Sequence, residues 1–489
     1  MKPTLQAKST PEADPIPQVN PETVASAGNR AIVIGASIAG LFAARILSER
    51  FAQVWLLERD ELPDAAVPRK GTPHALQPHG LLARGLQVME ELFPGFTDSL
   101  VARGALKGDI GQDVVFDADR RRFQRLRTGQ TGLLASRLAI EAELRRRTRS
   151  LPGVTMLAEV DVIEPVFDAT AARVTGVRML RRGPGLDAEP GAEPETVTAD
   201  LVVDCSGRGS RSPTWLDGWG YEPAREERVR IDLAYVSAYF ERESQVGEIR
   251  GVISTATPGL PRPAVLLAQE PDGQGRSRWV LGVGGYGKDQ PEGSIEGLRQ
   301  RAQAIGCAEL MDVAERRGLI GEVLRYRFPH SQRRHYERMR RFPAGYLVMG
   351  DALASFNPIY GQGMTVAACE ALELRRVLGR GLDGLAPRFF KAAAKVIDIP
   401  WQTAVGGDLA LPMVPGPRPL PVRLVNAYLH RVFEAAAEDP QVAAAFLQVM
   451  HMLRKPPSLM APRIMWRVLR ASRRPGADSF TLAPPLPRH

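Results

Sequence analysis

The chain has 489 residues, of which 44% are hydrophobic and 24% are charged. This length exceeds what one small hydrophobic core needs, so we expect two or three structural units in a protein of ordinary globular composition. The net charge is +9, but the basic residues are mostly arginines spread along the chain. Because no zinc-ligand spacing or RNA-binding signature accompanies them, we expect a solvated basic surface and no nucleic-acid partner.

The spacing of cysteines and histidines argues against a disulfide framework and a protein-bound metal. The three cysteines, Cys205, Cys307 and Cys369, show no Cys-x-x-Cys spacing, which predicts a reducing, cytoplasmic location without a disulfide framework. The seven histidines show no metal-ligand spacing, so we expect no protein-bound metal. No segment reaches the roughly 20 apolar residues of a membrane-spanning helix. Residues 1–28 are predicted to form a disordered leader without a signal sequence.

The first half of the chain opens with the pattern of a β-α-β unit. Ala31–Ile34 predicts a buried strand, a helical pattern follows, and Val54–Leu57 predicts a second buried strand that ends at Glu58. Further helices are predicted over 81–92 and 136–149, and strands over 114–126, 154–157, 174–180 and 201–204. Residues 183–195, rich in Pro, Gly and acidic side chains, predict a solvated hairpin loop.

The second half is β-rich over 231–283 and helical over 294–317, and it then returns to a buried strand at 346–349 and a helix at 364–378. From Pro400 onward the chain is predicted to be helical with proline breaks. We therefore expect an α/β (α+β) fold. A Rossmann-like domain would comprise residues 29–215 and 321–399, a mainly β substrate domain 216–320, and a helical C-terminal region 400–489.

The first motif that carries chemistry is Gly35-Ala36-Ser37-Ile38-Ala39-Gly40, between the first strand and the first helix. The first glycine permits a tight turn, and Gly40 lets the helix pack closely on the strand. The free N–H groups at the helix start favour a pyrophosphate. Ser37 replaces the middle glycine of the fingerprint but is small enough to fit. With Glu58 placed to bind ribose hydroxyls, the segment predicts a dinucleotide-binding site.

Two later segments have the shape of cofactor contacts. After the strand at 346–349 come Gly350-Asp351, an irregular loop, and the turn Gly361-Gln362-Gly363 at the start of a helix. Asp351 can accept hydrogen bonds from a sugar hydroxyl. The helix start favours developing negative charge, such as that on the N1–C2=O edge of a reduced flavin. After the strand at 201–204, a turn of small residues through Gly207 lets the backbone pass close to a cofactor.

These motifs resemble the FAD-dependent monooxygenases with the para-hydroxybenzoate hydroxylase fold. A closer resemblance is to the squalene-epoxidase-like bacterial enzymes that epoxidise polyether polyketides. It rests on Arg69-Lys70-Gly71-x-Pro73-His74, Leu92-Phe93-Pro94-Gly95, Ser206-Gly207-Arg208-Gly209-Ser210, and Gly350-Asp351-Ala352 through Asn357-Pro358-x-Tyr360-Gly361-x-Gly363-Met364. The resemblance covers roughly residues 30 to 400 and is loosest between Ile231 and Arg317.

The resemblance implies which residues bind FAD. The pyrophosphate would be held by Gly35, Ser37, Ile38, Ala39 and Gly40, and the adenosine ribose would be bound by Glu58 and Arg59. Phosphate or ribitol would be contacted by Arg69 and Arg137, and the ribityl chain would be bound by Gly350 and Asp351. Asp204 and Gly207 would form the small-residue turn beside the cofactor. Pro358, Gly361, Gln362, Gly363 and Met364 would face the isoalloxazine ring, and no side chain is assigned with certainty to catalysis.

The activity implied is that of a monooxygenase that inserts one oxygen atom from O₂, through a C4a-hydroperoxyflavin, into an apolar substrate of polyketide or isoprenoid type in secondary metabolism. Epoxidation and hydroxylation both stay open. Electrons would come from NAD(P)H, either directly or through a separate flavin reductase.

Two alternatives stay open: an FAD-dependent reductase or dehydrogenase of isoprenoid type, and a flavin halogenase. Halogenases need a Trp-x-Trp-x-Ile-Pro segment and a lysine above the flavin. Here Trp215 and Trp219 lie four apart, and Lys70 comes early in the chain.

Residues 461–474 predict a basic helix whose apolar side chains are Ile464, Met465, Val468 and Leu469. Such a helix can lie weakly on an anionic membrane surface. It can equally pack its apolar stripe against its own domain, with the arginines in water.

Overall fold

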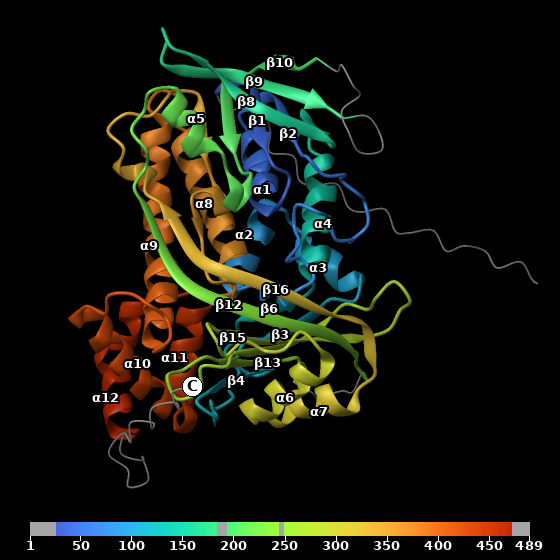
Figure 1. Ribbon diagram of the computed structural model, residues 1–489, viewed down its shortest axis with the longest axis vertical. Helices are drawn as coiled ribbons and strands as arrows, with labels where there is room; N and C mark the ends of the chain where they lie inside the picture. Colours follow the sequence, from blue (N-terminus) through green and yellow to red (C-terminus); the bar gives the residue numbers. More distant parts are fainter. Residues whose placement is uncertain (1–25, 183–192, 244–248, 472–489) are drawn as a thin grey trace, which may run out of the picture.

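The computed structural model describes residues 26–182, 193–243 and 249–471. In Figure 1 a parallel sheet with its helices occupies the upper half of the molecule, a second sheet crosses the lower half, and the C-terminal helices lie beside the second sheet. The predicted α/β (α+β) class is confirmed. Most of the predicted leader lies outside the described residues, but Gly28 already belongs to the first strand.

The upper sheet has five parallel strands in the order β17-β11-β1-β2-β7. They are β1 (Gly28–Ile34), β2 (Phe51–Leu57), β7 (Val154–Leu157), β11 (Leu201–Asp204) and β17 (Tyr346–Val348). Residues 31–33 are fully buried, as expected for a strand covered on both faces. Ile34 pairs with Leu57 on one side and with Asp204 on the other. Because the strands are parallel, the segments that follow them meet at one edge of the sheet.

Helices pack against this sheet and against one another. α1 (Ile38–Leu47) contacts β1 and β2, and α8 (Gly363–Leu378) packs on α1, α2 (Ala83–Leu92) and α9 (Leu385–Ala410). The upper half also contains α3 (Phe96–Ala102), α4 (Arg137–Arg149) and α5 (Ser212–Gly218). A three-stranded antiparallel sheet, β10-β9-β8, lies at the upper end in Figure 1 and is formed by β8 (Val160–Asp168), β9 (Arg173–Arg181) and β10 (Glu195–Thr198).

The lower sheet has eight strands in the order β18-β16-β12-β15-β14-β13-β4-β5. Its strands are β4 (Val114–Ala118), β5 (Arg121–Arg122), β12 (Glu226–Glu241), β13 (Gly251–Thr255), β14 (Ala264–Gln269), β15 (Arg278–Tyr286), β16 (Leu319–Arg334) and β18 (Ala354–Ser355). The long antiparallel pair β12 and β16 runs from the upper half into this sheet (Figure 1). A two-stranded sheet of β3 (Leu106–Asp109) and β6 (Thr131–Leu134), and helices α6 (Ile295–Ile305) and α7 (Ala308–Arg316), complete this half.

The observed boundaries between the parts differ from the predicted ones at two places. β4 and β5 pair into the lower sheet, although residues 29–215 were expected to form one unit with the Rossmann-like domain. The predicted boundary at residue 320 falls inside β16, which continues to Arg334. Strand pairing between segments far apart in the chain produces both differences, and a local pattern carries no information about such pairing.

The C-terminal region begins earlier than predicted. The expected boundary at Pro400 lies in the interior of α9, a helix of 26 residues in which both Pro400 and Trp401 are buried. A proline inside a helix removes one backbone hydrogen bond, and burial of this segment offsets that loss. After α9 come α10 (Leu420–Glu438), α11 (Pro440–Met450), the short turn η6 (Pro456–Met460) and α12 (Pro462–Ala471).

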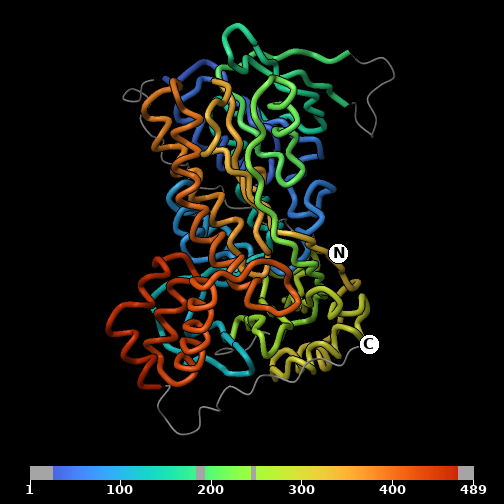
Figure 2. The backbone as a smooth tube through the Cα atoms, turned by 60° about the vertical axis from the view of Figure 1, so that its left-hand side comes forward, coloured from blue at the N-terminus to red at the C-terminus, as the bar shows by residue number. Residues whose placement is uncertain are grey.

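The C-terminal helices are fastened to the lower sheet by an aromatic cluster. Phe116 of β4 and Phe123 lie with their ring centroids 5.3 Å and 5.6 Å from that of Phe446 on α11. Val432 and Leu447 are buried in the same cluster. Figure 2 shows the result, with the red helices resting beside the cyan segment that carries β4.

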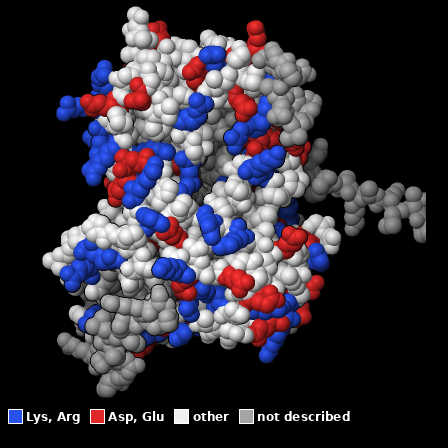
Figure 3. All heavy atoms as spheres, viewed as in Figure 1, with Lys and Arg blue, Asp and Glu red and all other residues white. Residues whose placement is uncertain are grey.

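The predicted tail helix forms, and its apolar residues divide between two environments. Val468 is buried and Ile464 is partly buried against α10 and α11, whereas Met465, Trp466 and Leu469 are exposed. Residues 472–474 of the predicted helix lie outside the described residues. None of the helices in the described part of the chain combines the length and hydrophobicity that crossing a bilayer requires. On the face seen in Figure 3, basic and acidic side chains are interspersed.

The contact between α1 and β1 leaves no room for a side chain at Gly40. A Cβ atom there would lie 1.8 Å from the carbonyl oxygen of Gly35. We expect Gly40→Ala to lower the free energy of unfolding by about 2–3 kcal/mol, because the helix must move away from the strand. Thermal unfolding of the FAD-free protein measures this effect. The matched control is Gly218→Ala at the end of α5, where a Cβ meets nothing within 4 Å; equal melting temperatures for the two variants would contradict the prediction.

Candidate cofactor and substrate site

A cavity of about 2750 Å³ lies between the edge of the upper sheet, the lower sheet and the C-terminal helices. A pocket for one small ligand measures about 300–1,000 Å³, so this cavity has room for a cofactor and a substrate together. Most residues singled out from the sequence line it: Gly35, Ser37, Ile38, Ala39, Glu58, Arg59, Arg69, Arg137, Gly207, Asp351, Pro358, Gly361, Gln362, Gly363 and Met364. Gly40, Asp204 and Gly350 do not line the cavity.

The glycine turn after β1 forms the floor of the first part of the cavity. Gly35 has a φ of +97°, a conformation that glycine adopts without strain. The backbone N–H of Ala36 donates to Glu58 Oε2 at 2.7 Å, which holds the Glu58 carboxylate beside the turn. The side chain of Ser37, at the N-cap of α1, makes no capping hydrogen bond. The N–H groups of the first turn of α1 are therefore left to a ligand, as a pyrophosphate site requires.

A buried group of charges lies beside this turn and connects three segments of the chain. Arg69 forms ion pairs with Glu141 of α4 and with Glu58, the latter at 3.3 Å between Nη1 and Oε2. Ser37 Oγ donates to Glu141 at 3.1 Å and accepts from Arg137 Nη2 at 3.0 Å. Burial raises the pKa of Glu141, but Arg137 and Arg69 outweigh it and hold that pKa below its usual range. Glu141 is therefore an anion that orients both arginines.

One donor of this group lacks a partner. The buried Nε of Arg137 makes no hydrogen bond within the described residues. Arg137 nevertheless lines the cavity next to the glycine turn, and the positive charge of its guanidinium suits a phosphate or ribityl oxygen of FAD at this position.

The Gly-Asp motif brings a carboxyl group, that of Asp351, to the cavity, whereas Arg137 brings a positive charge. Gly350, with a φ of +70°, passes so close to α1 that a Cβ would lie 2.5 Å from the Cβ of Ala39. This close approach brings Asp351 to the cavity wall. Burial raises the pKa of Asp351, while Arg137 and Arg208 act in the other direction. A carboxylate in this setting is suited to accept hydrogen bonds from ribityl hydroxyls.

Asp204, which the resemblance placed among the FAD-binding residues, does not line the cavity. It is fully buried at the end of β11, where it accepts hydrogen bonds from the backbone and hydroxyl of Ser206 and from the hydroxyls of Ser210 and Ser212. All of its lone pairs point into this turn, so the carboxylate shapes the segment through Gly207 instead of contacting a ligand. Gly207 itself lines the cavity, and a Cβ there would meet nothing within 4 Å.

The turn expected to face the flavin is held from behind by the C-terminal region. Asp408 of α9 is fully buried, and its Oδ1 accepts from Asn357 Nδ2 at 2.7 Å and from the hydroxyl of Tyr360 at 3.2 Å. Burial raises the pKa of Asp408 to about 7. The turn ends at Gly363, the first residue of α8, where a Cβ would meet nothing within 4 Å. Open space beside a glycine at a helix start fits a ring that stacks against the backbone.

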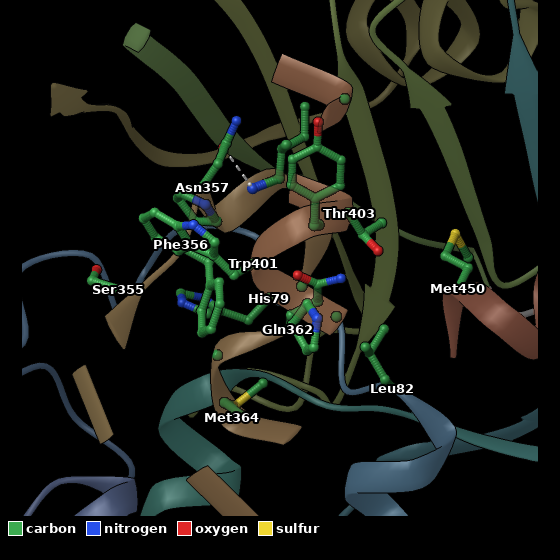
Figure 4. Close-up of a pocket in the computed structure, with 18 of the residues that line it drawn as sticks. His79, Leu82, Ser355, Phe356, Asn357, Gln362, Met364, Trp401, Thr403 and Met450 are labelled. Atoms are coloured by element: carbon green, nitrogen blue, oxygen red, sulfur yellow. Dashed lines mark hydrogen bonds between the residues drawn. The ribbon is translucent and has the colours of Figure 1, made fainter. Parts of the chain in front are cut away.

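Several cavity residues escaped prediction from the sequence. Figure 4 shows one of them, His79, beside the predicted Gln362 at the centre of the labelled side chains, with Trp401 on one side and Thr403 on the other. The C-terminal region also contributes Met450 and His451. The Pro-rich stretch around His79 looked like a plain loop, and nothing in the pattern after residue 400 indicated that its side chains face the motifs of the first 80 residues. Glu141 was not singled out either, because the sequence indicated only an Arg-rich helix over 136–149.

Comparison with known proteins agrees with this geometry. Residues 29–390 match the family model described as FAD binding domain, so the chain belongs to this family and the cofactor of the cavity is FAD. Protein Rv3254 from Mycobacterium tuberculosis (strain ATCC 25618 / H37Rv) is 34% identical over 435 residues, which cover 87% of this chain and 90% of that protein.

Solved structures share the fold at low sequence identity. The flavin-dependent brominase Bmp2 superposes with a TM-score of 0.61 at 13% identity, covering 91% of this chain and 99% of its own. A flavoprotein/dehydrogenase from Cytophaga hutchinsonii gives 0.60 at 16%, covering 90% and 96%. The p-nitrophenol 4-monooxygenase PnpA from Pseudomonas putida DLL-E4 gives 0.56 at 16%, covering 89% and 100%. The resemblance to monooxygenases of this fold is thereby supported, and the finer likeness to polyether epoxidases stays a prediction.

Asp351 at the cavity wall and the buried Asp204 should respond differently to substitution. Asp351→Ala should weaken FAD binding about 10- to 100-fold, because a hydrogen bond to a charged group contributes about 1.5–3 kcal/mol, and it should leave the melting temperature of the FAD-free protein nearly unchanged. Asp204→Ala should destabilise the FAD-free protein by about 3 kcal/mol, because buried hydroxyls lose their acceptor. Flavin titration and thermal unfolding separate the two effects. Wild-type FAD affinity in Asp351→Ala would show that the ribityl contact is misplaced.

Glu370 on α8 should make stability depend on pH. Burial raises the pKa of its carboxyl to about 8, against the opposing hydrogen bond from the Gly350 N–H. A glutamate in the unfolded chain titrates near 4.3, so between about pH 4.3 and 8 the folded protein holds a proton that the unfolded chain releases. The free energy of unfolding therefore falls as pH rises through this window, by roughly 1 kcal/mol per pH unit at most.

Glu370→Gln should flatten that dependence in the FAD-free protein, so that the variant gains stability relative to wild type between pH 5 and pH 8. Glu373→Gln, three residues along the same helix and paired with Arg376, serves as the control and should keep the wild-type slope. Parallel curves for Glu370→Gln and wild type would contradict the assignment of a protonated carboxyl.

Proposed function

We propose that the protein is an FAD-dependent monooxygenase that transfers one oxygen atom from O₂ to an apolar organic substrate. The observation that carries the proposal is the shared cavity, in which residues suited to FAD and a wall of apolar C-terminal side chains enclose one continuous space. Membership of the FAD binding domain family and the shared fold with a known monooxygenase support it.

Bound FAD, once reduced, supplies the activation of O₂, and the protein supplies orientation and a protected space. Arg137 and the start of α1 would bind the anionic phosphates, and Asp351 would bind the ribityl hydroxyls. The N-terminus of α8, at Gly363, carries a positive partial charge that would favour the negative charge of a reduced flavin. Asp408 holds this turn in place through Asn357 and Tyr360.

The far wall of the cavity indicates the kind of substrate. It is built from C-terminal side chains that are mainly apolar, among them Trp401, Leu409, Val422, Phe433, Phe446 and Met450. Such a wall keeps water away from reactive oxygen species and favours a substrate with a large apolar body. A polyketide or isoprenoid of secondary metabolism has this character. NAD(P)H, acting directly or through a reductase, is the proposed source of the two electrons that reduce the second oxygen atom to water.

A flavin halogenase is the first alternative, since the brominase Bmp2 shares the fold. Lys70 is exposed and does not line the cavity, and Trp219 stacks on Phe167 outside it. The lysine that does line the cavity among the described residues is Lys455, on the exposed segment before η6. These positions favour oxygen transfer to carbon over halogenation. An isoprenoid-type reductase or dehydrogenase is the second alternative, because it would use a similar apolar cavity.

Weak contact with a membrane surface is a further part of the proposal. Seven of the ten exposed large hydrophobic residues in the described chain lie between residues 420 and 469: Leu420, Leu424, Val425, Met460, Met465, Trp466 and Leu469. Leu424, Val425 and Met460 also line the cavity. An apolar substrate that partitions into lipid would reach the cavity through such an exposed apolar rim.

The decisive test is turnover under ¹⁸O₂ with NAD(P)H, with and without an added flavin reductase, on a panel of polyenes, terpenoids and phenols. We expect a product that carries one ¹⁸O atom, and mass spectrometry measures it. The Asp351→Ala variant, assayed at an FAD concentration that saturates wild type only, should form proportionately less product. A brominated product that requires bromide would identify a halogenase, and a reduced or desaturated product without ¹⁸O would identify a reductase or dehydrogenase.

A further inference from the structure

His79 is a polar side chain of the cavity, beside Gln362 and Trp401 (Figure 4), and its chemical state is determined by the backbone. Its Nδ1 lies 2.8 Å from the carbonyl oxygen of Gln77. A carbonyl oxygen only accepts hydrogen bonds, so Nδ1 must carry the hydrogen. Burial and the positive charge of Arg137 lower the pKa of His79 to about 3, so the ring is neutral near pH 7. The other ring nitrogen, Nε2, therefore has a free lone pair and no hydrogen.

His79 lines the cavity, and its Nε2 makes no hydrogen bond within the described residues. The ring lies 5.6 Å, centroid to centroid, from that of His74, whose ring centroid in turn lies 5.8 Å from that of Tyr326 in a tilted arrangement. His79 precedes Gly80, whose carbonyl oxygen lies 3.3 Å from where a Cβ of Gly361 would be. The acceptor is thus next to the turn that faces the flavin, where the reacting carbon of a substrate must lie.

A second histidine of the cavity has the opposite tautomer. His451 Nδ1 accepts a hydrogen bond from the backbone N–H of Ala83 at 3.1 Å. In the neutral ring the hydrogen must then be on Nε2, which makes it a donor. Burial lowers the pKa of His451 to about 4. The same stretch of chain, residues 79 to 83, therefore has an acceptor from His79 at one end and a donor from His451 at the other.

An unpaired acceptor in the cavity selects its ligand. Leu81 and Leu82, which follow His79 in the chain, are apolar residues of the same cavity wall. A ligand without a donor would leave Nε2 desolvated and unpaired, which costs free energy, whereas an O–H group satisfies it.

We propose that His79 Nε2 accepts a hydrogen bond from a hydroxyl group of the substrate, so that the substrate is a largely apolar phenol, enol or alcohol oxidised near that hydroxyl. The proposal rests on the proposed function only in taking the cavity as the substrate site. His79 is a specificity residue here: it orients the substrate and, for a phenol or enol, raises the electron density of the ring or double bond that receives oxygen.

Two variants of His79 separate recognition from support of the loop. In His79→Asn the amide nitrogen lies about where Nδ1 was, so the bond to Gln77 is kept and the acceptor at Nε2 is lost. In His79→Gln the side-chain oxygen lies about where Nε2 was, so the acceptor is kept and the bond to Gln77 is lost. A purely structural role would therefore make His79→Gln the more damaging change, and substrate recognition would make it His79→Asn.

The probes are 2-naphthol, which donates a hydrogen bond, and 2-methoxynaphthalene, which has the same ring system without the O–H. Binding is followed by the change in the visible spectrum of oxidised FAD in the holoprotein, so no turnover is needed. We expect wild type to prefer 2-naphthol by about five- to tenfold. In His79→Asn the preference should fall to twofold or less, and in His79→Gln it should stay above threefold.

Two other histidines provide controls. His451→Asn removes a donor from which either probe oxygen can accept, so both affinities should change together and the ratio should stay within twofold of wild type. His330→Asn alters a histidine that does not line the cavity, and it should leave both affinities at wild-type values.

The outcomes are distinguishable. Equal affinity of wild type for the two probes, binding of neither, or an unchanged preference in His79→Asn overturns the proposal. Loss of FAD affinity in His79→Asn with the preference retained would show that Nε2 binds an N–H of the flavin instead. Failure of ¹⁸O incorporation with an intact hydroxyl preference would refute the monooxygenase and leave the role of His79 standing.

Discussion

The buried carboxylate of Glu141 is the interaction on which the cofactor end of the cavity depends. It pairs with Arg69, accepts from Ser37 and lies near Arg137, so it joins α1, the loop after β2 and α4. Burying charges is unfavourable unless they are paired and hydrogen-bonded, and the cost is offset here because each charge has a partner. The consequence for function is that the charged guanidinium of Arg137 is held beside the glycine turn, at the wall of the cavity.

The position of Glu141 also explains why the glycine turn tolerates Ser37. In a standard fingerprint a glycine at this position lets the pyrophosphate approach the backbone. Here the serine side chain is drawn into the charged group by Glu141 and Arg137 and away from the helix N-terminus, since it makes no capping hydrogen bond. The N–H groups of α1 thus remain accessible although the middle glycine is absent.

The Asn357–Gly363 turn depends in its turn on the C-terminal region. α9 brings Asp408 under the Asn357–Gly363 turn, and α10 and α11 close the apolar wall above it while resting on Phe116 and Phe123. The region that the sequence motifs describe least well therefore forms the apolar wall of the cavity. A change in these helices would alter the volume of the cavity without touching the glycine turn or the Gly-Asp motif.

The sequence by itself determined the elements whose signal is local. Residues 31–34 and 201–204 are continuous apolar runs of strand length, and each is a strand in the structure; residues 136–149 carry an N-cap serine, and Ser136 caps α4. Gly35, Gly350 and Gly361 were identifiable because a positive φ or a close approach of two backbones excludes other residues. These features depend on neighbours within a few positions in the chain, so pattern and composition are sufficient to predict them.

Only the tertiary structure decided which distant segments share the cavity and which polar atoms have no partner within the protein. β4 pairs into the lower sheet. Both aspartates follow apolar strands, but Asp204 lies in a serine-lined turn and Asp351 lies at the cavity wall. The tertiary structure also gave His79 and His451 opposite tautomers, through one backbone carbonyl and one backbone N–H. The physical reason is that hydrogen bonding and burial are properties of the surroundings in space, and those surroundings come from segments hundreds of residues apart in the sequence.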